Sequence, residues 1–302
     1  MLKIFFAHQM QNLQIYHVPA FEKTILCHLQ ISPGQRIVDG TCGEGGHAAI
    51  IAPCLGESGL YIALDRDAEI LEKAKQRLAN SSVIRFFNHP YTMLGSALEA
   101  LKVQGVHCIL LDLGLSMYHL KTLDRGFSFM SDSPLDMRFN AQDSPVSALD
   151  VVNHFQENEI SDILYTFGEE RMSKQIAKRI VEKRKIKAIT TCSDLAQIIA
   201  SAKGWRQGSH PATKSFQALR IYVNAELYHL ENFLAQVHSW LLPQGLLAVI
   251  TYHSMEDRLL KNFSKASPYF SLRDKKPILP DEEELRSNAS VRSAKLRVLI
   301  RA

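Results

Sequence analysis

Short apolar runs alternate with amphipathic stretches through the first third of the chain. The runs at 36–39, 60–65, 83–88 and 106–113 predict strands, and the stretches at 47–55 and 68–79 predict helices. Strands that alternate with helices are typical of a parallel sheet covered on both faces. The pattern therefore predicts a doubly wound α/β fold with a mostly parallel sheet.

This alternation stops after residue 115. Residues 116–145 are rich in Ser, Asp, Pro and Gly and predict an extended loop, whereas residues 146–202 have a helical pattern throughout. Because strand-like runs return further along, we expect one discontinuous domain, 1–115 and 213–302, interrupted by a mainly helical insertion at 116–212.

The last third of the chain predicts a return to the sheet. One helix is expected at 213–242, followed by a buried strand at 246–252. A further helix is expected from Ser254, whose hydroxyl and the Asp257 carboxylate have the spacing of a capping box. The final strands are expected at 269–273 and 295–300.

Composition places the chain among globular proteins. Of its 302 residues, 46% are hydrophobic and 22% are charged, which excludes a disordered or collagen-like chain. The five cysteines form no CxxC pair and have no His at zinc-like spacing, so we expect reduced thiols and no metal. No uncharged apolar stretch reaches the roughly 18 residues that span a bilayer. We therefore expect a cytoplasmic protein with no membrane association.

A glycine-rich segment, DGTCGEGGHA at 39–48, follows the first predicted strand. Its glycines let the backbone approach a ligand, and Asp65, at the end of the second strand, is placed to bind a ribose. The spacing G-x-G-x-x-A from residue 43 also fits a dinucleotide fingerprint. Asp39 favours S-adenosylmethionine, because a carboxylate there would repel a pyrophosphate and attract the ammonium of a methionine moiety. A nicotinamide dinucleotide, or a turn without a ligand, remains the alternative.

A third carboxylate, Asp112, ends the fourth predicted strand. Ligands of open parallel sheets lie beyond the carboxyl ends of the strands, so Asp39, Asp65 and Asp112 are expected in one crevice. Asp112 is placed to accept a proton or hydrogen bond from an amine substrate; its alternative role is a cap. Cys42 and Cys108 lack the surroundings of a nucleophile and are expected to pack in the core, which favours direct in-line transfer.

The formal net charge of +4 is unevenly distributed. Residues 171–187 contain eight Lys or Arg and one Glu, and the rest of the chain is therefore slightly acidic. On a helix, Ile176 and Ile180 would lie opposite a basic face. That face is suited to a nucleic-acid backbone, or it is simply solvated. Its candidate RNA-binding residues are Arg171, Lys174, Lys178 and Lys185.

Aromatic and basic residues are interleaved in the long loop of the insertion. Phe127 and Phe129 belong to the segment RGFSFM at 125–130, and SPLDMR follows at 133–138. Such aromatics can stack on an exposed base. They can equally form a hydrophobic plug under the loop, and the sequence leaves both roles open.

Motifs of one family follow each other in order along the chain after residue 16. They are HVP (17–19), DGT (39–41), GGH (45–47), RGFSFM (125–130), PLDMR (134–138), GEER (168–171), HPAT (210–213), FQALR (216–220), HSMEDR (253–258) and RSAKLR (292–297). With these motifs the chain resembles the MraW (RsmH) family. Members of that family are bacterial S-adenosylmethionine-dependent methyltransferases that act on the N4 amine of a cytidine in 16S ribosomal RNA.

The resemblance implies a class I methyltransferase sheet with a helical insertion that helps to hold RNA. It also implies cofactor contacts at Gly45, Gly46, His47, Asp65 and Asp112. Two further contact positions differ from the family pattern, since Tyr91 replaces the usual Phe and His119 the usual Gln.

Together these observations predict methyl transfer from S-adenosylmethionine to a cytidine N4 amine of 16S rRNA. The expected partner is the rRNA or the small ribosomal subunit, and a homodimer is left open. The alternatives from other classes are an NAD(P)-dependent oxidoreductase and a non-catalytic RNA-binding assembly factor.

Overall fold

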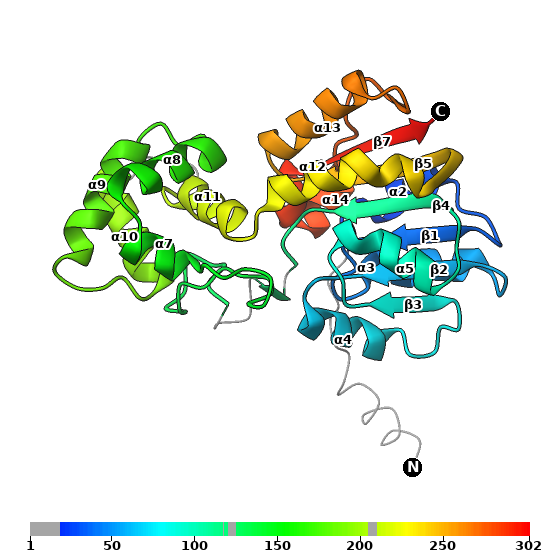
Figure 1. Ribbon diagram of the computed structural model, residues 1–302, viewed down its shortest axis with the longest axis horizontal. Helices are drawn as coiled ribbons and strands as arrows, with labels where there is room; N and C mark the ends of the chain where they lie inside the picture. The colour runs from blue at the N-terminus through cyan, green and yellow to red at the C-terminus, as the bar shows by residue number, and fades with distance from the viewer. Residues whose placement is uncertain (1–18, 117, 120–124, 205–209) are drawn as a thin grey trace, which may run out of the picture.

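A seven-stranded sheet forms the centre of the larger part of the molecule (Figure 1). The computed structural model describes residues 19–116, 118–119, 125–204 and 210–302. In spatial order, the strands are β3 (Ile84–Phe87), β2 (Leu60–Leu64), β1 (Arg36–Asp39), β4 (Val106–Asp112), β5 (Leu241–Thr251), β7 (Lys295–Arg301) and β6 (Phe270–Leu272). The predicted strands are all present, with bounds that differ at their ends.

The first five strands are parallel, and β7 runs antiparallel to both of its neighbours. The strand order reverses between β1 and β4, which are neighbours although β2 and β3 separate them in sequence. Such a reversal opens a crevice at the carboxyl ends of the strands, where open α/β sheets bind their ligands. The prediction of a doubly wound, mostly parallel sheet is confirmed.

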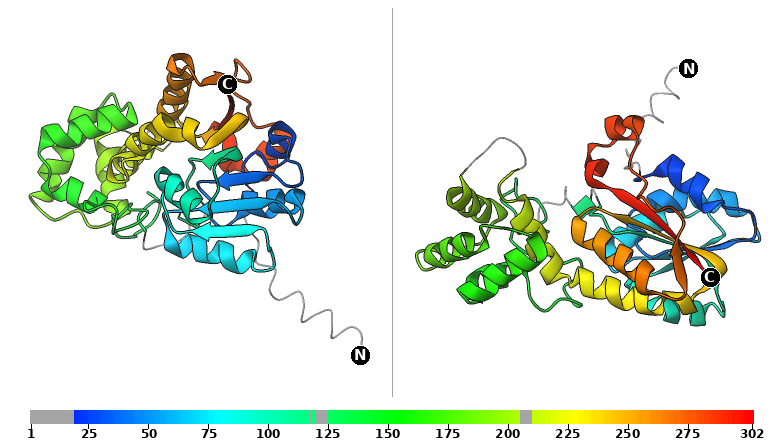
Figure 2. Two further views of the ribbon diagram at one scale, coloured as in Figure 1. Left: turned by 45° about the vertical axis from the view of Figure 1, so that its right-hand side comes forward. Right: turned by 90° about the horizontal axis from the view of Figure 1, so that it is seen from above.

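Helices cover both faces of this sheet (Figure 2). In β2, Tyr61 and Ala63 pack into one hydrophobic cluster and Ile62 into the other, as the two-residue period of a strand requires. The first cluster includes residues of α2 (Glu22–Leu29), α3 (Gly46–Ile51) and α4 (Ala68–Arg77), and the second includes residues of α5 (Leu94–Ala100), α12 (Glu226–Gln236) and α13 (Ser254–Ala266).

A second group of helices lies beside the sheet and has its own hydrophobic core (Figure 1). It comprises α7 (Ala148–His154), α8 (Glu157–Gly168), α9 (Ser173–Arg184), α10 (Cys192–Lys203) and α11 (Thr213–Val223). The loop at 125–139 packs against the same core through Phe127, Leu135 and Met137. None of the helices in the described ranges has both the length and the apolar run needed to cross a membrane.

The single helix predicted at 213–242 is wrong. The chain forms α11 and α12 instead, separated at Asn224 and Ala225, where Ala225 adopts a left-handed conformation with φ 49°. The Asn224 side chain holds the turn by donating to the carbonyls of Met137 (2.7 Å) and Arg220 (2.9 Å). This break turns the chain from the helical core, which α11 joins, to the sheet, which α12 covers.

Two local expectations also need correction. The cap of α13 is His253 with Glu256, one residue earlier than predicted, because Asp257 pairs with Arg297 at 2.6 Å. The strand expected at 246–252 is β5 and already begins at Leu241, since the segment before it pairs with the start of β4.

Candidate functional site

One cavity of about 320 Å³ lies at the carboxyl ends of β1, β2, β4 and β5. It extends from the glycine-rich segment after β1 to the break between α11 and α12. The predicted cofactor residues that line it are Gly46, His47, Asp65, Tyr91, Asp112 and His119. The structure therefore brings together residues that are far apart in sequence.

Glycine is required at two points of the segment after β1. A Cβ at Gly40 would lie 2.5 Å from Leu111 Cδ2 and 2.8 Å from Tyr91 Cβ. Gly45 adopts φ 78°, and its Cβ would lie 2.7 Å from Leu78 Cδ1. The segment can therefore pack tightly beneath the cavity while its backbone stays close to whatever the cavity holds. Gly45 supports the turn, although it does not itself line the cavity.

Asp65 follows β2 and faces the cavity next to this segment. Its carboxylate accepts hydrogen bonds from the backbone N–H groups of Gly43 (2.8 Å) and Asp67 (2.9 Å). Burial raises the pKa of Asp65 to about 6, although these hydrogen bonds act in the opposite direction. An ionised carboxylate has about four lone-pair sites, so Asp65 can still accept hydrogen bonds from ligand hydroxyls.

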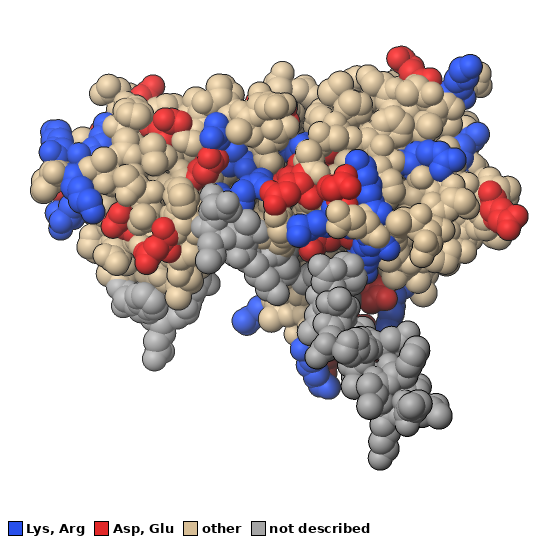
Figure 3. Space-filling model, turned by 90° about the horizontal axis from the view of Figure 1, so that it is seen from below, with Lys and Arg blue, Asp and Glu red and all other residues tan. Residues whose placement is uncertain are grey.

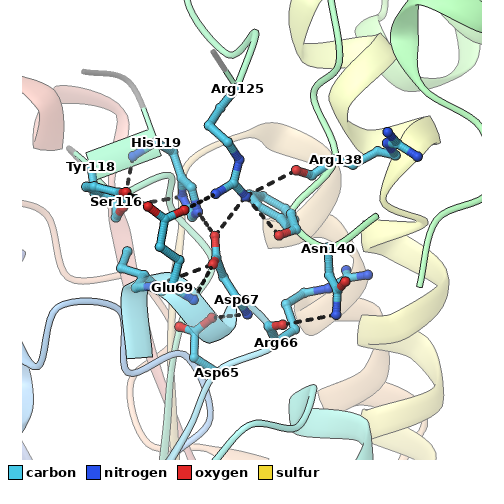
Figure 4. A network of polar contacts seen from close by, with 12 residues as sticks. Asp65, Arg66, Asp67, Glu69, Ser116, Tyr118, His119, Arg125, Arg138 and Asn140 are labelled. Carbon is cyan, nitrogen blue, oxygen red and sulfur yellow. Dashed lines mark hydrogen bonds and ion pairs between the residues drawn. The ribbon is translucent and has the colours of Figure 1, made fainter. Parts of the chain in front are cut away.

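The end of the cavity beside Asp65 is connected to the loop at 125–139 by a buried carboxylate, Asp67 (Figure 4). Asp67 caps α4 by accepting from Glu69 N (3.0 Å) and also contacts His119 Nε2 (2.9 Å) and Arg125 Nη2 (2.8 Å). Burial alone would raise the pKa of Asp67, but His119 and Arg125 hold it at about 2. Asp67 is therefore ionised across the physiological range.

Arg125 extends this network to the cavity wall (Figure 4). Its guanidinium also donates to the carbonyls of Arg138 (3.3 Å) and Phe139 (2.9 Å) and to Glu69 Oε2 (3.3 Å). Phe139 lines the cavity. One guanidinium thus joins the α4 end of the sheet to the loop that forms the opposite wall.

The structure contradicts the prediction that Asp39 contacts a cofactor. Its side chain is fully buried and does not line the cavity. Its carboxylate accepts from Tyr61 Oη (2.8 Å) and from Thr41 N (3.1 Å), and burial raises its pKa. Asp39 lies beneath the glycine-rich segment, where it holds the turn, because the last residue of β1 points into the core.

Asp112 lies at the end of β4 and lines the cavity. It accepts from Gly114 N (3.1 Å), so the capping role considered from the sequence is present. Burial and the adjacent, hydrogen-bonded Asp112 carboxylate raise the pKa of Tyr252 well above its usual range. Tyr252 therefore stays protonated and holds the carboxylate in place.

Sequence reasoning missed most residues at the far end of the cavity. Arg220, near the end of α11, donates from Nε and Nη2 to the two carboxylate oxygens of Glu226, the first residue of α12, at 2.8 Å each. Both side chains line the cavity, as do His229, Tyr252 and Glu256. Arg220 ends one of the family motifs, but a continuous helix across 213–242 would have hidden its pairing with Glu226.

Glu226, His253 and Glu256 have potential metal-ligand atoms within 4.8 Å of one another. Other contacts already account for two of these groups. Arg220 engages both oxygens of Glu226, and Glu256 accepts from the backbone N–H groups of Tyr252 (2.8 Å) and His253 (3.3 Å). We therefore assign the cluster to ion pairing and helix capping.

Phe127 and Phe129 both pack against other aromatic rings. Phe127 is 6% exposed and stacks on Phe139 with ring centroids 5.2 Å apart. Phe129 stacks on His210 at 4.4 Å and meets Phe216 edge-on at 5.7 Å. Both pack against the core of the helical group. The structure therefore favours the hydrophobic plug, and burial contradicts base stacking for Phe127, whereas base stacking by the half-buried Phe129 stays a prediction.

The basic stretch forms α9 and its flanks. Arg171, Lys174, Lys178 and Lys185 are exposed, while Ile176 is fully buried in the helical core. Figure 3 shows Lys and Arg side chains gathered at the outer end of the helical group. The amphipathic arrangement is as expected, and contact with RNA stays a prediction.

The chain is similar to known proteins over nearly its whole length. The family model described as the MraW methylase family matches residues 14–302. A relative from Dictyoglomus turgidum, named ribosomal RNA small subunit methyltransferase H, is 42% identical and aligns over 96% of this chain and 98% of its own. Relatives with the same name from Nostoc sp. (41% identical, 93% and 91% covered) and Brevibacillus brevis (39% identical, 96% and 99% covered) match similarly. The chain belongs to the MraW methylase family.

Proposed function

We propose that this protein transfers a methyl group from S-adenosylmethionine to the N4 amine of a cytidine in small-subunit ribosomal RNA. The observation that carries the proposal is family membership over nearly the whole chain, with relatives named ribosomal RNA small subunit methyltransferase H. The cavity at the topological switch point supplies a site for the reaction. Action on ribosomal RNA would place the protein in the cytoplasm.

The cavity fits S-adenosylmethionine in its charges and in its glycine-rich floor. Asp65 offers a carboxylate where the ribose hydroxyls would lie, next to the backbone of Gly43 and Gly46. His47, Tyr91 and His119 would form the surrounding walls. Glu44 also lines this end, and its charge disfavours the pyrophosphate of a dinucleotide.

The residues of the chain support direct transfer. When bound, S-adenosylmethionine supplies an electrophilic methyl group on a sulfonium. Asp112 accepts a hydrogen bond from the acceptor amine and orients its lone pair, while Tyr252 holds the Asp112 carboxylate. Burial raises the thiol pKa values of Cys42 and Cys108 well above their usual range, so neither can provide a thiolate nucleophile.

The helical group would hold the RNA beside this cavity. We place its boundary after α11 rather than at residue 212, because Phe216, Leu219 and Val223 pack in the helical core. The exposed basic side chains of α9 would contact phosphates. The sheet part and the helical group thus divide methyl transfer and RNA binding between them.

Labelled methyl transfer tests the proposal. Purified protein and tritiated S-adenosylmethionine are incubated with small ribosomal subunits and, separately, with rRNA from cells that lack the modification. Label is expected in the rRNA of at least one substrate, and absence from both would contradict the proposal. In parallel, S-adenosylhomocysteine should raise the melting temperature and NADH should not; the reverse result would favour an oxidoreductase.

A further inference from the structure

The far end of the cavity contains a donor and an acceptor that are held side by side. Arg220 and Glu226 are each 13% exposed at the side chain and line the cavity. Two hydrogen bonds of 2.8 Å lock the guanidinium against the carboxylate. The turn at Asn224 and Ala225, which brings the two helices together, fixes the pair in position.

This pair keeps unused hydrogen-bonding capacity. Arg220 uses Nε and Nη2, and its Nη1 makes no hydrogen bond with any residue in the described ranges. The Glu226 carboxylate has about four lone-pair sites, of which Arg220 occupies two. The pair can therefore present an acceptor and a donor to a ligand in the cavity.

Neighbouring charges indicate which part of an RNA can enter this end. Asp112 and Glu256 line it together with Glu226, and Arg66, which donates to the Asn224 carbonyl at 3.3 Å, is a second guanidinium beside Arg220. Three carboxylates thus face two guanidinium groups, and the lining of this end is negative overall. A phosphate would be repelled, whereas a base edge that carries an amine would be attracted. In Glu256, Oε2 accepts from two backbone N–H groups and Oε1 lies 3.1 Å from His253 Nε2, which leaves Glu226 as the carboxylate that is held by a guanidinium.

We propose that the Arg220–Glu226 pair reads the Watson–Crick edge of the acceptor base and selects cytosine over uracil. Glu226 accepts from the exocyclic amine, and Arg220 donates to the adjacent ring nitrogen or carbonyl oxygen. Uracil presents the opposite order, a carbonyl and then an N–H, which would face the carboxylate and the guanidinium respectively. Buried groups left unpaired in this way are costly, so the site rejects uracil.

This inference rests on the proposed function and is tested by competition. RNA fragments with cytidine or uridine at the target position compete with the substrate, and their inhibition constants are compared. The wild-type protein should prefer cytidine by about tenfold or more. Glu226→Gln should reduce that preference to within about threefold, because an amide can present either an acceptor or a donor. The matched control is Glu231→Gln, an exposed residue of the same helix, which should keep the preference.

A second comparison needs no variant. RNA carrying pyrimidin-2-one at the target position lacks the exocyclic amine, and the wild-type protein should bind it about tenfold more weakly than cytidine. The same replacement should weaken binding less in Glu226→Gln, and S-adenosylhomocysteine affinity should be unchanged in that variant. Equal wild-type binding of the two RNAs, or a full preference in a folded Glu226→Gln protein, would overturn the inference. Failure of the wild-type protein to methylate rRNA would instead refute the proposed function.

Discussion

We predict that Asp65 makes cofactor binding depend on pH. Its pKa is raised to about 6, and only the ionised carboxylate can accept hydrogen bonds from both ribose hydroxyls. Affinity should therefore fall as the pH falls through 6. We predict that S-adenosylhomocysteine, measured by calorimetry, binds about tenfold more weakly at pH 5 than at pH 8.

The Asp65→Asn variant isolates this effect from the histidines of the cavity. It should bind weakly at every pH and lose the pH dependence, because an amide does not titrate. Equal wild-type affinity at pH 5 and pH 8 would show that Asp65 does not bind the ribose in its ionised form.

Phe127 is predicted to act on stability rather than on RNA binding. It is 6% exposed and packs in the core of the helical group, so Phe127→Ala should lower the free energy of unfolding by about 3–4 kcal/mol. Met130→Ala, at a side chain that is 76% exposed, should change it by less than about 0.5 kcal/mol. Denaturant titration measures both. A stable Phe127→Ala protein with weakened RNA binding would instead restore the base-stacking role.

For a residue that directly follows a strand or a glycine turn, a place at the cavity could be predicted from the sequence. A place that depends on the direction of the side chain could not. Asp65 and Asp112 were placed at the cavity because each ends or follows a parallel strand. Asp39 also ends a strand, but alternation along four residues does not show which face its side chain takes. Glu226 was missed because its role depends on the turn at 224–225.

Among the elements, α4 and the loop at 125–139 are joined through Asp67. The folded-state pKa of about 2 lies below the usual value, so this carboxylate stabilises the fold above about pH 4, and the contribution disappears as the pH falls toward 2. At pH 7, Asp67→Asn should therefore lower the free energy of unfolding by about 3 kcal/mol, because it leaves Arg125 without its buried partner.

An exposed carboxylate in a longer ion pair provides the control for Asp67. Asp143 lies 3.7 Å from Arg66 and is 39% exposed, so Asp143→Asn should cost less than about 1 kcal/mol. Thermal or urea unfolding at pH 7 compares the two variants. If both variants lower the free energy of unfolding by a similar small amount, the Asp67 network does not hold the loop.

The outer face of α9 is predicted to bind RNA through charge. Replacing Lys174, Lys178 and Lys185 by Glu should weaken binding and make it less sensitive to salt, because fewer counterions are released. The slope of log K against log salt should fall in magnitude by about two to three.

Charge reversal on another surface distinguishes RNA binding by the α9 face from a general effect of the protein's net charge. Lys261, Lys265 and Lys275 are also exposed but belong to the sheet part of the molecule. Their triple substitution by Glu changes the net charge equally and should reduce the slope much less. Equal effects of the two triple variants would show that α9 is a solvated basic face with no specific role in RNA binding.

At the scale of the whole molecule, the alternation of strands and helices predicted the sheet well, because periodicity reports burial directly. The division between the two parts was less predictable. α11 is amphipathic like α12, and only the tertiary packing shows that α11 joins the helical core and α12 the sheet. The cavity wall depends on this division, since Arg220 and Glu226 come from the two sides of the break.

The proposed reaction is the methylation of a cytidine amine of small-subunit rRNA. Mass-spectrometric mapping of small-subunit rRNA, from cells with and without this protein, detects its product. We predict one cytidine that carries an extra methyl group on N4 only when the protein is present. An rRNA methylation pattern that is identical in both samples, or a gained methyl group on another atom, would contradict methylation of a cytidine N4 amine by this protein.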